Sequence, residues 1–394
     1  MLKPYCLFAF LLLFCLQSIA DQNGNYSIGE SVSNAIIKRH QPTINQLTNS
    51  GWDHANSVVL HGMEKIYLKN GDRDYLLYIK RYADEFIDAD GNVNGLSLTL
   101  DGLHPGTLCL FLYEQTGEKK YLQAAHHMRE HFLGSESRPS AFSKTPDGGY
   151  WHKNVEKYRN VMTVDGLYMV YPFLVRYALM TKQPLLLDIA ADQILLVSER
   201  SFNIKYNLPY HTWNYDKTKE WANPITGTSS QFWSRASGWF AMALVDVLEY
   251  FPKSHPKYDE LLFLYQSLAQ GIKATQNPGN GFWYQVLDAP DEKGNYPEAS
   301  GTGMMVYALQ KGVNLKLLDK SYADAAEKGW RAFKTKVVAY EDGGPQITSF
   351  APGMGSQVDY EAYVAIRPVS IPSPSGKQHT HGYIAALMAS SVME

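Results

Sequence analysis

The sequence predicts an all-α protein, and within that class an (α/α)6 barrel of six helical hairpins. Two observations support this prediction. Pairs of helix-length segments recur along the chain, the first of each pair nearly apolar and the second amphipathic. The glycines that open four of the apolar segments, at positions 102, 166, 238 and 301, are separated by 64, 72 and 63 residues. Regular self-similarity of this kind is typical of one supersecondary unit stacked repeatedly.

The expected helices can be followed along the chain from their apolar periodicity. Periodic segments at 28–49, 52–69 and 75–86 predict the first three helices. Later apolar helices are expected to open at Asp101-Gly102, Asp165-Gly166, Ser237-Gly238, Ser300-Gly301 and His381-Gly382. Each of the first four is followed, after a break, by an amphipathic segment. The short run at 281–288 has the pattern of a strand and is expected to form a hairpin that decorates a loop.

The difference between the two kinds of helix predicts their arrangement. A helix without a polar face has to be buried, so the apolar helices should form an inner ring and the amphipathic ones an outer, solvated ring. Counting starts near Trp52 and at the five later openings gives six inner helices, which can close on themselves. An open solenoid is the alternative, but it would expose the first and last apolar helices, and no polar capping repeat is visible.

Composition limits the classes of partner. The chain has 394 residues, of which 45% are hydrophobic and 13% aromatic, and residues 21–394 are expected to form one domain. The net charge is −3, and Lys and Arg form no block or stripe. We therefore expect neither nucleic acid nor an anionic membrane as partner, but a small molecule or a neutral to acidic polymer. The oligomeric state stays open.

Residues 1–20 have the pattern of a secretory signal peptide. Lys3 precedes an apolar run, and Ser18-Ile19-Ala20 offers small residues for cleavage. This predicts export to the periplasm or the medium; an N-terminal anchor is the second interpretation, and lipoprotein cleavage at Cys15 a third. The mature chain would keep only Cys109, so no intramolecular disulfide is expected. The sequence has no familiar metal-ligand spacing, and we expect neither a metal nor a cofactor.

The loops before the inner helices are the expected place of the functional site. If the inner helices are parallel, these loops meet at one end of the barrel, and they are rich in Trp, His, Asp and Arg. For any one such residue a purely structural role is more common. Their recurrence at the same place in successive hairpins favours a site, because structural aromatic residues would be distributed over both ends.

Asp101 and Asp165 occupy equivalent places in neighbouring hairpins, so a barrel should bring two carboxyl groups to one rim. Asp165 taken alone would more often be a helix N-cap. If the two carboxyls are close in a poorly hydrated pocket, the pKa of one should rise and supply a general acid, although the helix N-terminus opposes that rise. Arg235 could pair with a carboxylate-bearing sugar between the faces of Trp233 and Trp239, and His211 could donate a hydrogen bond.

Several motifs resemble glycoside hydrolase family 105, the unsaturated rhamnogalacturonyl hydrolases. They are GGYWHKN, VDGLYMVYPFLVRYA, HTW and FWSRASGWFAMALVDVLEYFP, and the resemblance covers about residues 30–392. It implies an (α/α)6 barrel that removes a 4,5-unsaturated uronic acid from the non-reducing end of lyase-generated oligosaccharides, by hydration of the C4=C5 bond. It further implies Asp165 as general acid and base, Asp101 as its assistant, and substrate contacts from Lys153, His211, Trp233, Arg235 and Trp239.

The resemblance leaves the leaving sugar open. Where the family commonly has Trp two residues before the catalytic Asp, this chain has Thr163. The sugar could be rhamnose of a pectin fragment or sulfated rhamnose of an algal polymer such as ulvan. Two other functions stay possible at this point: a hydrolase of saturated glycosides that uses the carboxylate pair directly, and a non-catalytic carbohydrate-binding protein at an outer surface.

Overall fold

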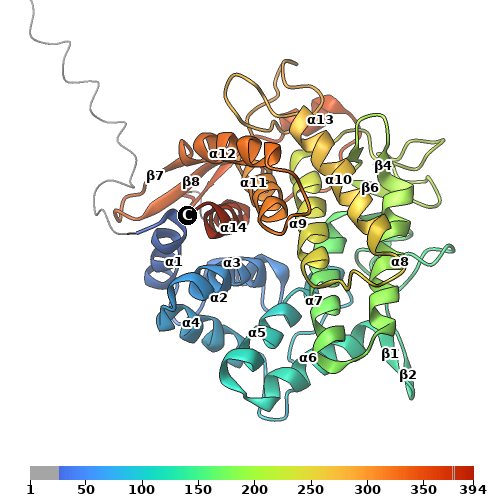
Figure 1. Cartoon of the computed structure of the whole chain (residues 1–394), viewed down its shortest axis with the longest axis vertical. Coiled ribbons are helices and arrows are strands. Elements are labelled where there is room, and N and C mark those ends of the chain that lie inside the picture. The colour runs from blue at the N-terminus through green and yellow to red at the C-terminus, as the bar shows by residue number, and fades with distance from the viewer. Residues whose placement is uncertain (1–25, 375, 377) are drawn as a thin grey trace, which may run out of the picture.

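Six helices form a closed inner ring in the described part of the chain (Figure 1). The structure is a computed structural model that describes residues 26–394 except 375 and 377, so the predicted signal peptide lies outside the described residues. Each inner helix packs against the next, and the last packs against the first. The ring consists of α3 (His54–Asn70), α5 (Gly106–Thr116), α7 (Asp165–Thr181), α9 (Ser234–Tyr250), α11 (Ala299–Asn314) and α14 (His381–Met393).

Six further helices surround this ring, each against one inner helix. Taken in the order of their inner partners from α3 to α14, they are α4 (Arg73–Asp84), α6 (Lys119–Leu133), α8 (Leu185–Ser201), α10 (Tyr258–Ala274), α12 (Ser321–Lys334) and α1 (Ile28–Arg39). The predicted division is confirmed by burial: every residue of α9 from Ser234 to Leu248 is buried, whereas α12 buries one face only. The (α/α)6 barrel follows from this division, because only a second ring can cover apolar helices from outside.

The two ends of the described chain close the barrel. The backbone N–H of Ile28 donates to the Glu394 side chain at 2.9 Å, and that of Gly29 donates to Ser390 Oγ at 2.8 Å. These bonds satisfy N–H groups in the first turn of α1, which have no partner within their own helix. The outer helix of the sixth hairpin therefore comes from the start of the chain and its inner helix from the end.

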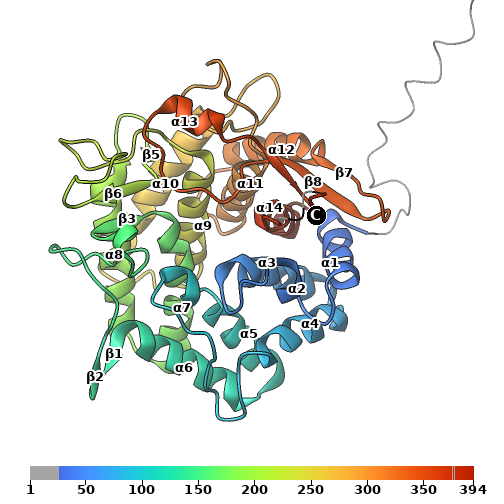
Figure 2. The ribbon, with the colours of Figure 1, turned by 180° about the vertical axis from the view of Figure 1, so that it is seen from behind.

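Short elements decorate the loops at the ends of the helices. A 3-10 turn, η2 (Leu100–Leu103), precedes α5, and the strand pair β3 (Val161–Thr163) and β6 (Thr212–Asn214) lies beside α7 and α8 (Figure 2). The remaining elements are α2 (Asn45–Thr48), η3 (Glu156–Tyr158), α13 (Tyr360–Ala365), the pairs β1 (Gly134–Ser135) with β2 (Arg138–Pro139) and β4 (Phe202–Asn203) with β5 (Leu208–Pro209), and the sheet of β7 (Val337–Ala339), β8 (Pro345–Phe350) and β9 (Val369–Ile371).

The structure corrects two local predictions. The helix expected over 28–49 ends at Arg39, and α2 is a separate turn. Pro42 explains the break, since proline lacks the N–H of a helix interior and disfavours helical backbone before it. The run at 281–288 forms isolated β-bridges, such as the one between Tyr284 and Pro297, and none of its residues belongs to a β-strand. Among the described helices, none is both long and apolar enough to cross a membrane.

Candidate active site

All seven residues singled out in the sequence line one cavity of about 380 Å³. The cavity lies at the end of the barrel where the inner helices begin, because Asp165, Arg235 and His381 stand in the first turns of α7, α9 and α14. The predicted residues in its wall are Asp101, Lys153, Asp165, His211, Trp233, Arg235 and Trp239. Parallel inner helices account for this, since they place the preceding loops at one rim.

Asp101 sits in η2 and is surrounded by groups that favour its anion. Its Oδ2 is 2.6 Å from Lys153 Nζ, and its Oδ1 is 3.3 Å from His152 Nε2. The side chain is buried, and burial alone would raise its pKa; His54, His152 and Lys153 nevertheless hold the pKa of Asp101 well below its ordinary value. This carboxyl group is therefore ionised near neutral pH.

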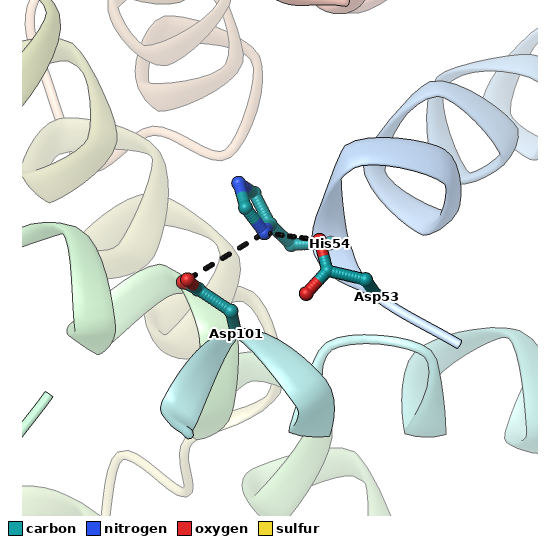
Figure 3. Close-up of side chains that lie close together, drawn as sticks. All are labelled: Asp53, His54 and Asp101. Atoms are coloured by element: carbon teal, nitrogen blue, oxygen red, sulfur yellow. Dashed lines mark ion pairs between the residues drawn. The ribbon is translucent and has the colours of Figure 1, made fainter. Parts of the chain in front are cut away.

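His54, the first residue of α3, lies between two carboxylates (Figure 3). Its Nδ1 is 2.8 Å from Asp53 Oδ1 and 3.7 Å from Asp101 Oδ2. Burial opposes the charged ring, but Asp101 and Asp53 raise the pKa of His54 to about 9. The ring is thus an imidazolium at neutral pH, and it adds positive charge to the wall of the cavity.

The same three residues, Asp53, His54 and Asp101, could offer one ligand atom each to a metal ion. Their present contacts compete with that role. An ion at Asp101 Oδ2 would have to share this oxygen with the ammonium group of Lys153, and His54 would first have to lose a proton. As arranged here, the cluster is better suited to hold Asp101 in place than to bind a cation.

Asp165 is the first residue of α7, yet its side chain does not cap the helix. The N-cap residue is Val164, which forms no side-chain capping bond. Oδ2 of Asp165 faces His211 Nε2 at 3.4 Å, while the buried Oδ1 has no hydrogen-bond partner among the described residues. Asp165 therefore does not have the N-capping role that is commonest for an aspartate at the start of a helix.

The prediction that the pKa of one of the two carboxyl groups rises is wrong for the protein without substrate. Burial raises the pKa of Asp165, but His211, His152 and Arg235 outweigh it and leave the pKa below its ordinary value. Positive and hydrogen-bonding groups, rather than repulsion by Asp101, dominate the surroundings of Asp165. The two carboxyls differ instead in their contacts, since Asp101 has three partners and Asp165 one.

The β3–β6 pair sets the distance between Asp165 and His211. Thr163 pairs with Thr212 in this register, and the N–H of Val164 donates to the carbonyl of His211 at 3.1 Å. Thr163 Oγ1 is 2.9 Å from His152 Nδ1 and accepts from the N–H of Gly166 at 3.2 Å. Thr163 thus orients His152, one of the two histidines beside Asp101.

Arg235 does not face the cavity with its whole guanidinium group. It is 1% exposed; Nη1 donates to the Ala351 carbonyl and Nη2 to the Pro352 carbonyl, each at 2.6 Å, while Nε has no hydrogen-bond partner in the part of the chain that the structure describes. The bidentate contact predicted between Arg235 and a sugar carboxylate would therefore have to use Nε–H and the second N–H of Nη2. Its carbon Cζ lies 4.4 Å from the Trp233 ring centroid, and Trp239 packs against Tyr168 at 5.2 Å.

The predicted site was incomplete in two places. His54 and His381 are the first residues of α3 and α14, and the segments WDHAN and HTHGY that contain them are rich in polar and aromatic residues, which could have been a signal. Residues 353–357, by contrast, form part of the wall from the connection between β8 and α13. They precede no inner helix, and nothing in their composition marks them as part of the site.

Comparison with known proteins identifies the family. The model of Glycosyl Hydrolase Family 88 matches residues 28–394. The chain is similar to a glycoside hydrolase of family 105 from C. acetobutylicum ATCC 824, with a TM-score of 0.81 and 29% identity over 93% of this chain and 99% of that one.

Two curated relatives are named after an enzymatic activity. The unsaturated 3S-rhamnoglycuronyl hydrolase of Alteromonas sp. (strain LOR) is 32% identical over 45% of this chain and 41% of that protein. The unsaturated rhamnogalacturonyl hydrolase YesR of Bacillus subtilis (strain 168) is 24% identical over 75% and 83%. Other curated relatives, 37% identical, are matched over 66% of their own length. The family model spans all the helices of the barrel and the whole wall of the cavity, and the chain belongs to Glycosyl Hydrolase Family 88.

Proposed function

We propose that this glycoside hydrolase removes a 4,5-unsaturated uronic acid from the non-reducing end of oligosaccharides left by polysaccharide lyases. One observation carries the proposal: Asp101 and Asp165 line the same cavity but in different environments. Asp101 is held as an anion by Lys153, His152 and His54, whereas Oδ1 of Asp165 has no hydrogen-bond partner among the described residues. Such a pair divides the work between a fixed charge and a proton carrier.

The charge of the cavity supports an anionic sugar. Lys153, His54 and Arg235 supply cationic groups, and Trp233 and Trp239 supply ring faces. A bound uronate would place a negative charge near Asp165 and weaken the net positive influence that lowers its pKa. The substrate itself would then promote protonation of the acid that acts on it, so a low pKa of Asp165 in the free protein is compatible with its role as an acid.

The proposed reaction hydrates the double bond. Protonated Asp165 gives its proton to C4, a water molecule adds its oxygen to C5, and the proton lost by that water returns to Asp165. The product at C5 is a hemiketal; it opens, and the neighbouring sugar leaves from C1. One water is consumed, Asp165 is regenerated, and the absorbance of the C4=C5 bond disappears.

The names of the two relatives support two choices of leaving sugar, a 3-sulfated rhamnose and the rhamnose of rhamnogalacturonan. Lys157 is exposed and lines the cavity. Its ammonium group suits a sulfate ester on the leaving sugar, so we favour the sulfated substrate of the ulvan type.

The test is incubation with unsaturated disaccharides from ulvan, pectin and glycosaminoglycan, followed by the loss of double-bond absorbance. We expect turnover of at least one, with ulvan fragments fastest and the ulvan preference reduced by Lys157→Ala. Turnover of saturated nitrophenyl glycosides without loss of double-bond absorbance would contradict the proposal, and so would binding of all fragments without any turnover.

We also infer that the protein is exported, on the basis of the signal pattern at residues 1–20. Mass spectrometry of the protein from its own host should find a mature chain that begins near Asp21. A chain that retains residues 1–20 in the cytoplasmic fraction would contradict export.

A further inference from the structure

The segment 351–357 forms one wall of the cavity although it belongs to no inner-helix loop. It connects β8 to α13, and Gly353, Met354, Gly355, Ser356 and Gln357 line the cavity. A connecting segment without regular structure keeps its place only through bonds to rigid elements. Its bonds are therefore the determinant of this wall.

The start of the segment is held by two buried charged side chains. The N–H of Ala351 donates to Glu298 Oε1 at 2.8 Å, and the Ala351 carbonyl accepts from Arg235 Nη1 at 2.6 Å. Arg235 Nη2 donates to the next carbonyl, that of Pro352, at 2.6 Å. Glu298 is 0% and Arg235 1% exposed. Charge-assisted bonds between buried groups are short and directional, so they fix the position of this backbone.

Glu298 is itself fixed at the start of α11, where it is the N-cap. It accepts from the N–H groups of Ser300 at 3.1 Å and Gly301 at 2.5 Å, and from Ser300 Oγ at 2.6 Å. Ser300 Oγ in turn accepts from Arg235 Nη1 at 3.2 Å. With the bond from Ala351, the carboxylate accepts four hydrogen bonds, three at Oε1 and one at Oε2, and these bonds fix its orientation.

The far end of the segment reaches the histidine that faces Asp165. Ser356 Oγ is 3.2 Å from His211 Nδ1 and 2.5 Å from Thr212 Oγ1. On its other side, His211 presents Nε2 to Asp165 Oδ2 at 3.4 Å. If the Ser356 hydroxyl donates to Nδ1, the neutral ring carries its proton on Nε2, where it can donate to the carboxylate.

We propose that Glu298 and Arg235 are positioning residues that clamp the peptide of Ala351, and that Ser356 thereby holds His211 in the Nε2–H form directed at Asp165. None of the three has to touch the reacting carbon atoms for this role. The proposal rests on the proposed function and deepens it, because it names what orients the partner of the proton carrier proposed above. Its structural part can be tested without any substrate.

The first test is the protonation of His211, observed by long-range ¹H–¹⁵N correlation in protein with ¹⁵N-labelled histidine. The signal is assigned by its absence in His211→Gln. We expect Nδ1 to be unprotonated and Nε2 to carry the proton in the unchanged protein, and a mixture of tautomers in Ser356→Ala and in Glu298→Gln. An Nδ1–H form or an imidazolium in the unchanged protein would overturn the proposal, as would an unaltered signal in both variants.

The second test separates kcat from KM on the unsaturated disaccharide that is turned over best. Misplacement of a catalytic partner can cost up to about 100-fold; we expect kcat to fall about 10- to 100-fold in both variants and KM to stay within about twofold. Ser356→Thr, which keeps the hydroxyl group, should restore most of kcat. A raised KM with unchanged kcat would show that the segment only binds substrate and would overturn the positioning role.

A matched control lies at the other end of the same connection. Asp359 caps α13 through the N–H of Ala362 at 2.9 Å, and it is exposed. Asn is an equally good cap, so Asp359→Asn should leave kcat and the His211 signal unchanged. A change in Ser356→Ala but not in Glu298→Gln would overturn the clamp. Absence of turnover with every unsaturated substrate would contradict the proposed function and leave the result for His211 standing.

Discussion

At the scale of single residues, the site depends on a difference between two aspartates that look alike in the sequence. Both stand before an apolar segment and both are followed by Gly-Leu. Asp101 lies in a 3-10 turn among three cationic or hydrogen-bonding partners, and Asp165 lies at the helix start with one oxygen that has no partner among residues 26–394 as described. The roles proposed for them differ because their neighbours differ, and the neighbours come from other parts of the chain.

Replacement of Asp165 tests the role of proton carrier. Asp165→Asn removes the group that gives and takes the proton but preserves its shape, so kcat should fall by about 10² to 10⁴-fold. Affinity for the unsaturated disaccharide, measured by calorimetry, should stay within about threefold. Asp188→Asn on the surface of α8 is the control and should keep full turnover. Full turnover by Asp165→Asn would exclude the role.

The raised pKa of His54 predicts a pH-dependent contribution to stability. Its pKa lies at about 9 in the folded protein, against an ordinary value of 6.5. The folded state binds this proton more tightly than the unfolded state, so the contribution is complete below pH 6.5 and is lost as the pH rises through 9. It is of order 3 kcal/mol.

Urea unfolding of the unchanged protein and of His54→Gln at pH 6 and pH 9.5 measures this contribution. The difference in free energy of unfolding between the two proteins should be large at pH 6 and should shrink at pH 9.5. The other titrating groups are common to both proteins and largely cancel in this comparison. A difference that is the same at both pH values would contradict the raised pKa.

At the scale of elements, helix packing and strand register place the side chains of the site. The β3–β6 register brings His211 to Asp165, and Gly166 leaves room for His152, since a Cβ at Gly166 would lie 3.1 Å from His152 Nδ1. Close approach also occurs between inner helices. A Cβ at Gly303 of α11 would lie 2.7 Å from Ala385 Cβ and 2.8 Å from the Ala385 carbonyl oxygen of α14.

Gly303→Ala should therefore destabilise the protein. Backbone atoms of α14 cannot yield as a flexible side chain would, and overpacking of this kind typically costs about 1 to 3 kcal/mol. Chemical denaturation should show a lower midpoint. Gly355→Ala is the control, since a Cβ there meets nothing within 4 Å, and its effect should stay within about 0.5 kcal/mol. Equal stability of the two variants would contradict the close packing.

The elements also show where prediction from the sequence succeeded and where it failed. The starts of the apolar helices near Gly166, Gly238 and Gly301 can be predicted, because a helix without a polar face is recognisable from its residues alone. The clamp of the segment 351–357 could not be found, because Glu298 and Ala351 are far apart in the sequence and their bond carries no local pattern. The prediction that one of the two carboxyl pKa values rises is wrong for the same reason, since the pKa of Asp165 depends on partners such as His211 that folding brings near.

At the scale of the whole molecule, the far end of the barrel holds a second buried group of charges. It lines a cavity of about 320 Å³ that includes His61, Glu64, Arg176, Asp246 and Lys311. Lys311 Nζ lies 2.7 Å from both Asp246 Oδ1 and Glu249 Oε2, so it ties α11 to α9. These charges are costly to bury, and they are tolerated because each carboxylate has a partner.

Removal of one partner should be more damaging than removal of both. Lys311→Met leaves Asp246 buried without its cation, and we expect a loss of about 3 to 5 kcal/mol in the free energy of unfolding. The double variant Asp246→Asn with Lys311→Met should lose less than Lys311→Met alone. Both can be measured by chemical denaturation, and an equal or greater loss in the double variant would contradict a coupled pair.

The sequence by itself determined the six-hairpin barrel and the end of the barrel where the cavity lies, because apolar periodicity and the repeat are local or regular properties that need no coordinates. Six of the residues in the cavity wall also follow from the loops before the inner helices, whereas Lys153 was expected only from the resemblance to a known family. Only the tertiary structure decided the environment of each carboxyl group, the engagement of Arg235 with backbone carbonyls, and the contribution of Ser356. Electrostatic and hydrogen-bonding partners act over a few ångströms in space, and that proximity between distant residues exists only once the ring has closed.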